Sequence, residues 1–211
     1  MASLPPDKAK AYTLQIKEIL AANKVANKNL ESIIGRIERT SYVVPNAKFF
    51  INRLRHLQYH SVKQGWAYLP KPVQLDLQLH LRFIKEAELG TSINNLVCRR
   101  PSHIYYADSC PFGLGGYSCR GRAWRFYIPP SLRSIHTNNV LEFIAQIICI
   151  WIDALEGNLQ PLSCCLGCSD SSSSVGWMFR TNFDPDIKPT HEECSRHLAT
   201  ILLDYKSILY A

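Results

Sequence analysis

Apolar residues recur every three to four positions through much of the first hundred residues, and this spacing predicts helices. Three segments show it, residues 5–24, 27–44 and 46–58. Pro45 separates the second segment from the third, because the residue before a proline is pushed into an extended conformation. The sequence therefore predicts a helical region over residues 1–96.

One further segment of this region, KPVQLDLQLHLRFIKEAELG at residues 71–90, fits two structures. Leucines at every second position from Leu75 to Leu81 are typical of a strand. A helix is favoured by the length of the segment, by its Gln, Lys and Glu content and by the closing Gly90. We therefore predict a helix.

The pattern changes near residue 97. Three short β-prone runs follow, HIYYAD, GLGGYSC and RAWRFYI, and Arg120-Gly121 between the last two indicates a hairpin. A strongly apolar helix is predicted over residues 137–157, then a strand, LSCCLGCSD, that ends in Asp170, and two more helices. This order predicts an α/β domain over residues 97–211, with three antiparallel strands, a helix-linked fourth strand and helices packed on the mixed sheet.

Composition and charge narrow the class of protein. Hydrophobic residues make up 46% of the chain and charged residues 19%, which is typical of a globular protein. The longest apolar run, residues 144–152, is short for a membrane span and contains Gln146, and the N-terminus lacks the apolar core of a secretory signal. We therefore expect an intracellular protein, in the cytoplasm or the nucleus.

The net charge of +7 is unevenly distributed. Residues 1–100 hold 16 Lys+Arg and 7 Asp+Glu, whereas residues 101–211 hold 8 and 10, so the halves carry about +9 and −2. A basic half beside an acidic half suggests an arm that binds a polyanion next to a site built from carboxylates. The alternative is that the lysines and arginines only make the helices soluble.

The chain has eight cysteines without the regular spacing of a disulfide-rich domain. Cys165 and Cys168, followed by His191, Cys194 and His197, have the residue types of a zinc site. However, residues three apart on a strand point to opposite faces, so the segment favours buried cysteines.

Three acidic residues occupy positions that a sheet and a helix can bring together. Asp108 ends the first strand, Asp170 ends the strand after the apolar helix, and Glu142 lies in the first turns of that helix. Carboxylates crowded together repel one another unless a cation neutralises them, and hard oxygen ligands select Mg²⁺ or Mn²⁺. A pair of such ions can activate water and stabilise a departing oxygen. The alternative is a turn residue, or a helix cap in the case of Asp170.

The series YYADSCPFGLGGY, NNVLEFIAQI and LGCSDSSSSVGWM resembles the ribonuclease H domain of reverse transcriptases. That family has an aspartate on the first strand, a glycine-rich second strand, a glutamate on a helix and an aspartate on the fourth strand. The stretch from LPPDKAKAY to NAKFFINRL resembles the thumb and connection that precede this domain in retrotransposons of the DIRS type or related LTR elements.

The resemblance implies a function and a set of residues. It implies metal-dependent hydrolysis of the RNA strand of RNA–DNA hybrids, with Asp108, Glu142 and Asp170 as catalytic residues and ligands of two Mg²⁺ or Mn²⁺ ions. The basic arm is then expected to contact the nucleic-acid backbone. Candidate contacts are Arg36, Arg39, Lys48, Arg53 and Arg55. The expected partners are an RNA–DNA hybrid or another nucleic acid and the rest of a reverse transcriptase polyprotein, with no membrane.

Two departures from the family pattern leave the function open. The family's polymerase palm is missing, and so is its fourth acid, because we expect the ribonuclease-H-like domain to stop before its last strand. Asp204 is predicted to lie within a helix and is not assigned that role. A catalytically inactive nucleic-acid-binding remnant is therefore the alternative, and an integrase-type strand-transfer domain is a third hypothesis.

Overall fold

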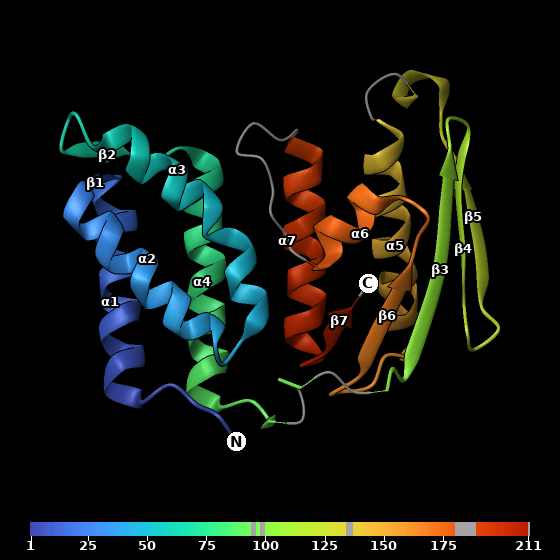
Figure 1. The fold of residues 1–211 in the computed structure, drawn as a ribbon, viewed down its shortest axis with the longest axis horizontal. Helices are drawn as coiled ribbons and strands as arrows, with labels where there is room; N and C mark the ends of the chain where they lie inside the picture. Colours follow the sequence, from blue (N-terminus) through green and yellow to red (C-terminus); the bar gives the residue numbers. More distant parts are fainter. Residues whose placement is uncertain (94–95, 98–99, 134–136, 180–188, 211) are drawn as a thin grey trace. The chain divides into compact units, whose positions relative to one another are not determined.

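The computed structural model describes residues 1–93, 96–97, 100–133, 137–179 and 189–210. The chain forms two compact units (Figure 1): the first comprises Met1–Val97, and the second begins at Cys98. The change of unit lies next to the boundary that the sequence pattern places between residues 96 and 97. Each unit has a core of its own and is described by itself.

The first unit is built mainly of helices. They are α1 (Pro6–Ala22), α2 (Asn27–Ser41), the 3-10 helix η1 (Pro45–Phe50), α3 (Asn52–Ser61) and α4 (Lys71–Leu89). The helical prediction is thus confirmed, and the ambiguous segment is α4, which ends at Gly90 with a positive φ of 89°. Two details differ: residues 46–58 divide at Ile51 into η1 and α3, and a two-stranded ribbon pairs β1 (Lys24–Ala26) with β2 (Trp66–Tyr68).

The core of the first unit consists of the apolar faces of these helices. Ile33 of α2, Leu54 of α3 and Leu77 of α4 are fully buried. Among them lies an ion pair in which Arg53 Nε donates to Asp76 Oδ2 at 2.6 Å and Nη2 donates to Oδ1 at 3.1 Å. This bidentate pairing neutralises a carboxylate that is 0% exposed, and it links α3 to α4.

The second unit is an α/β domain around a five-stranded mixed sheet. Its strands are β3 (His103–Cys110), β4 (Gly113–Ser118), β5 (Ala123–Tyr127), β6 (Cys164–Cys168) and β7 (Ile208–Tyr210). The order across the sheet is β5-β4-β3-β6-β7 (Figure 1). The first three strands are antiparallel, and β6 and β7 lie parallel to β3. This strand order is that of a ribonuclease-H-like fold, and the predicted fold class is confirmed.

Three helices complete this unit, α5 (Asn138–Leu155), α6 (Ser172–Phe179) and α7 (Pro189–Asp204). By length and composition α5 is the one helix among the described residues that is apolar enough to cross a membrane. One side of the helix nevertheless lies in the core, where Phe143, Ala145 and Ile150 are at most 1% exposed, whereas Trp151 and Leu155 are exposed. Burial against β3 and β4 therefore accounts for the apolar character of α5.

Two strand ends differ from the sequence prediction. β3 runs two residues past Asp108, because Ser109 and Cys110 continue the ladder opposite Leu114 and Gly113. The expectation that the domain stops before its last strand is also corrected. Three residues form β7, which pairs with β6 in parallel.

Candidate metal centre

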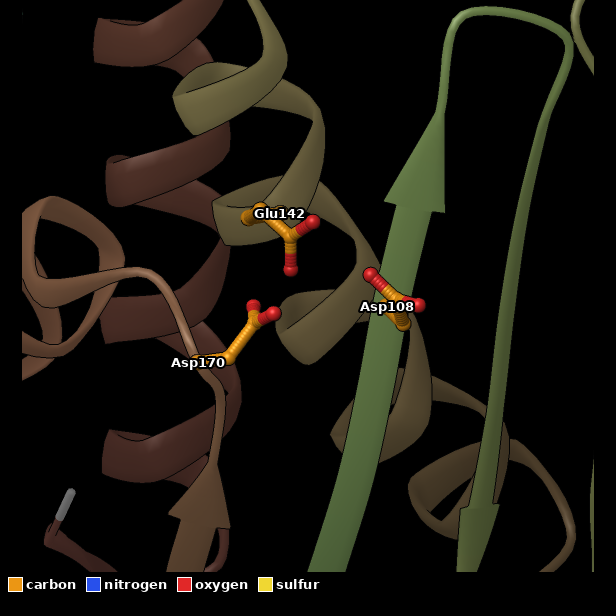
Figure 2. A group of neighbouring side chains, drawn as sticks. All are labelled: Asp108, Glu142 and Asp170. Carbon is orange, nitrogen blue, oxygen red and sulfur yellow. The ribbon is translucent and has the colours of Figure 1, made fainter.

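Strand register brings Asp108 and Asp170 to the same level of the sheet. β3 and β6 are parallel neighbours in which Tyr106 lies beside Cys168, and each aspartate follows two residues later. Neighbouring strands are ~4.8 Å apart, so the two carboxylates lie beside each other, Asp108 within β3 and Asp170 two residues past the end of β6. Glu142 reaches the same point from α5 (Figure 2). One carboxylate oxygen from each residue lies within 4.8 Å of the others.

Glu142 is the buried and fixed member of the group, with 2% of its surface exposed. The Ser109 hydroxyl and amide donate to its Oε1 at 2.8 and 3.0 Å, and the Ser169 hydroxyl donates to its Oε2 at 3.3 Å. Burial raises the pKa of the Glu142 carboxyl above its ordinary value, and the hydrogen bonds from Ser109 act in the opposite direction. The nearby Asp108 carboxylate adds to the increase. A cation at this position would stabilise the charged form of Glu142.

Asp170 does not serve as the cap of the following helix. Ser171 has that role, since its hydroxyl accepts a hydrogen bond from the Ser174 amide at 3.2 Å at the start of α6. Asp170 itself is exposed, and its carboxylate points toward Asp108 and Glu142 (Figure 2). The alternative explanation of Asp170 as a helix cap therefore does not hold.

The three residues fit a hard divalent cation. Two exposed aspartates and one buried glutamate offer oxygen ligands only, the donor type that Mg²⁺ and Mn²⁺ prefer. Exposed carboxylates would admit water or a substrate oxygen beside the ion, whereas the buried Glu142 would hold the ion against the protein. The residues predicted from the sequence are thus brought together, and their catalytic role stays a prediction.

A groove of about 1160 Å³ extends from Asp108 and Asp170 over β3, β4 and β5. Three tyrosines that sequence reasoning did not single out line it, Tyr106, Tyr117 and Tyr127. A usable signal was present, because Tyr106 lies two residues before Asp108 on one strand and therefore shares its face. Ser109 and Ser169 were also missed, and nothing in the local sequence indicates that both contact Glu142.

The predicted nucleic-acid contacts differ in how accessible they are. Arg39 and Lys48 are exposed, and Arg36 is half-buried with its guanidinium 5.1 Å from the Tyr12 ring. Arg55 is exposed and forms an ion pair with Glu38. The prediction for Arg53 is corrected, because this residue is buried in its ion pair with Asp76 and does not present its charge to a phosphate.

Two cysteines of the segment LSCCLGC follow the prediction of burial. Cys164 and Cys165 are at most 1% exposed, and burial raises the pKa of Cys165 to about 12. Cys168 lies on the opposite face of β6 and lines the groove, so it does not converge with Cys165 on a metal. The side chain of His191 lies outside the described residues.

Comparisons with known proteins add little to this geometry. Neither a protein-family model nor a curated protein matches the chain. Among solved structures, a foamy viral protease-reverse transcriptase dRH in complex with double-stranded DNA aligns with 99% of this chain. The identity is 14% and the TM-score 0.34, and the chain spans 35% of the length of that protein. At this TM-score the similarity carries no argument. The fold assignment depends on the strand order, and the assignment of the site depends on the geometry of its residues.

Proposed function

We propose that this chain is a ribonuclease H module preceded by a thumb or connection segment of a retrotransposon reverse transcriptase, of the DIRS type or a related LTR element. Its reaction would be the metal-dependent hydrolysis of the RNA strand of RNA–DNA hybrids inside the cell. The observation that carries the proposal is the convergence of Asp108, Glu142 and Asp170 at the end of a ribonuclease-H-like sheet.

The chain's own residues have distinct parts in this chemistry. A bound Mg²⁺ or Mn²⁺ supplies an activated water and offsets the charge of the departing oxygen. Asp108 and Asp170 would hold the ion from the solvent side, where the scissile phosphate approaches. Glu142, fixed by Ser109 and Ser169, would hold it from the protein side. Deprotonated Glu142 is needed for binding, so the ion and a proton compete for this carboxylate.

The alternative is a nucleic-acid-binding module without cleavage. One observation favours it. Among the residues that the structure describes, the acidic group has three members, whereas the family that the sequence resembles has four acidic residues in its site. In that case the exposed basic residues of the first unit would provide the binding. Hybrid binding with a steep salt dependence and no product would support this alternative.

The test uses a labelled RNA–DNA hybrid with Mg²⁺ or Mn²⁺, with wild type and Asp108→Asn compared side by side. We expect wild type to shorten the RNA strand and the variant to leave it intact, because the amide removes one anionic ligand without changing shape. Thermal unfolding of both proteins without metal shows that the variant is folded. Equal cleavage by the variant would overturn the assignment of the site.

A further inference from the structure

Three rows of residues cross β3, β4 and β5 on the face of the sheet away from α5. The opposite face packs on α5, as Gly116 and Trp124 show by their contact with Cys149. Strand register defines the rows, since residues directly opposite each other share a face. The rows are Tyr106–Tyr117–Ala123, Asp108–Gly115–Arg125 and Cys110–Gly113–Tyr127. Successive rows are ~7 Å apart, two residues along a strand.

The outer rows present aromatic rings to solvent. The rings of Tyr106 and Tyr117 are stacked, with centroids 4.8 Å apart and planes 15° apart, yet they are 39% and 52% exposed. Tyr127, two rows away, is 69% exposed, and the Arg133 guanidinium lies 4.9 Å from its ring. Exposed rings that line one groove are typical of a binding surface rather than of scattered surface residues.

The middle row carries charge and leaves space. Asp108 of the acidic group stands at one side, and Arg125, two strand spacings or ~10 Å away, at the other. Within the part of the chain that the structure describes, Arg125 makes no ion pair or side-chain hydrogen bond. Between them, a Cβ added to Gly115 would meet only the Trp124 carbonyl oxygen, at 3.5 Å. A side chain would therefore fit at position 115, so packing of the sheet does not explain why this residue is a glycine.

We infer that this face binds an unpaired segment of a nucleic-acid strand beside the metal centre, with a phosphate over Gly115 near Arg125 and bases on the tyrosine rows. The inference rests on the proposed function, because it takes the cleaved polymer to be nucleic acid. Splayed bases stack on aromatic side chains, whereas bases inside a duplex are already stacked on both sides. Arginine supplies the complementary charge for the phosphate.

An apolar segment of another protein fits this face less well. It would cover Arg125 and Asp108 with apolar groups and bury both charges ~10 Å apart. A nucleic-acid strand instead brings a phosphate to Arg125 and a reactive bond to the carboxylates. The charges of the middle row therefore favour the polyanion.

The first experiment measures binding of a fluorescently labelled single-stranded 12-mer by anisotropy in EDTA, where no metal-dependent cleavage occurs. We expect the double variant Tyr106→Ala/Tyr117→Ala to bind about 10-fold more weakly than wild type. Arg125→Gln, which removes an exposed charge without affecting packing, should also weaken binding. Tyr42→Ala, at a tyrosine that is 78% exposed in the first unit, is the matched control and should bind like wild type. Unchanged affinity in both groove variants would overturn the inference.

The second experiment uses two cysteines as internal reporters. Cys110 and Cys119 are both exposed, but only Cys110 lines the groove. Saturating oligonucleotide should slow the alkylation of Cys110 several-fold and leave the rate at Cys119 unchanged, as read by mass spectrometry. Equal rates at Cys110 with and without the oligonucleotide would count against binding at this face.

Failure of the inference and failure of the proposed function give different results. Groove-dependent binding in EDTA without cleavage of any hybrid in Mg²⁺ or Mn²⁺ would refute the nuclease and keep the binding face. If wild type cleaves the hybrid but the groove variants bind the oligonucleotide normally, the nuclease stands and the binding face is refuted. If the tyrosine variants instead turn a dimer into a monomer in sedimentation, with oligonucleotide binding unchanged, the face is an interface between copies and the inference is wrong.

Discussion

At the scale of single residues, Glu142 shows how a buried carboxylate is held ready for a cation. Its two oxygens accept hydrogen bonds from Ser109 and Ser169, which come from the ends of two neighbouring strands. These serines fix the position of the carboxylate and partly offset the cost of burying it. They carry no charge themselves, so their removal leaves the number of anionic ligands unchanged.

We expect Ser109→Ala to weaken Mn²⁺ binding about 10-fold, because residues that orient metal ligands typically contribute factors of this size. Isothermal titration calorimetry without nucleic acid measures the affinity. Ser172→Ala, at an exposed serine of α6, is the control and should bind Mn²⁺ like wild type. A Ser109→Ala protein with unchanged affinity would show that Glu142 does not need the Ser109 hydroxyl to bind the ion.

Two adjacent glycines of β4 differ in what surrounds them. A Cβ on Gly116 would lie 2.7 Å from Cys149 Sγ and 2.9 Å from the Tyr106 carbonyl oxygen, whereas one on Gly115 meets only an ordinary contact. Gly116→Ala should therefore lower the free energy of unfolding by ~1–3 kcal/mol, the usual cost of overpacking. Gly115→Ala should change it by less than ~1 kcal/mol. Urea denaturation compares them, and equal losses would contradict the assignment of the two faces.

At the scale of elements, α4 holds a buried histidine between aromatic rings. His80 is 0% exposed, lies beside Phe50 and Phe83, and has Nε2 3.4 Å from the Phe50 carbonyl oxygen. Burial lowers the pKa of His80 from 6.5 to about 4. The helix therefore packs with a neutral imidazole, and charging it is unfavourable in the folded state.

The sign of the resulting pH dependence follows from proton binding. Between pH 6.5 and pH 4 the unfolded chain binds more protons at His80 than the folded chain, so stability falls as the pH falls. The loss at His80 should reach up to ~3 kcal/mol near pH 4. His80→Leu should remove this part of the pH dependence in urea denaturation. His103, whose pKa is also lowered by burial, is retained in both proteins, so their difference isolates His80. Parallel stability curves for the two proteins would contradict the prediction.

At the scale of the whole molecule, charge and chemistry lie in different units. The helical unit, residues 1–97, holds 14 Lys+Arg and 7 Asp+Glu, or about +7, whereas residues 98–211, which contain the acidic group, hold 10 of each. Electrostatic attraction to phosphates is therefore expected from the first unit and cleavage from the second. The salt dependence of binding measures the attraction to phosphates independently of cleavage.

We expect Arg39→Gln/Lys48→Gln to reduce the slope of log K against log salt by up to about 2 for a duplex, since each phosphate contact contributes roughly 0.9. Both side chains are exposed, unlike Arg53. Lys8→Gln/Lys10→Gln removes the same charge from exposed positions of α1 and serves as the control. If the two double variants lower the slope equally, net charge rather than a defined contact explains binding.

The sequence alone determined the features that depend on near neighbours in the chain. Apolar spacing located α1, α2 and α3, length and composition indicated α4, and the order of strands and helices predicted the mixed sheet. Strand ends and one helix start also identified Asp108, Glu142 and Asp170 as candidate ligands. Each of these inferences needs only the period of a helix or strand, which is fixed by backbone geometry over a few residues.

Only the tertiary structure decided which side chains meet across the chain. Arg53 has the pattern of an exposed basic residue, but its partner Asp76 is 23 positions away and buries it. Ser109 and Glu142 are 33 positions apart, and strand register alone aligns Tyr106, Gly115 and Arg125 on one face. Burial and register depend on packing between distant segments, and local sequence patterns carry no information about that partner choice.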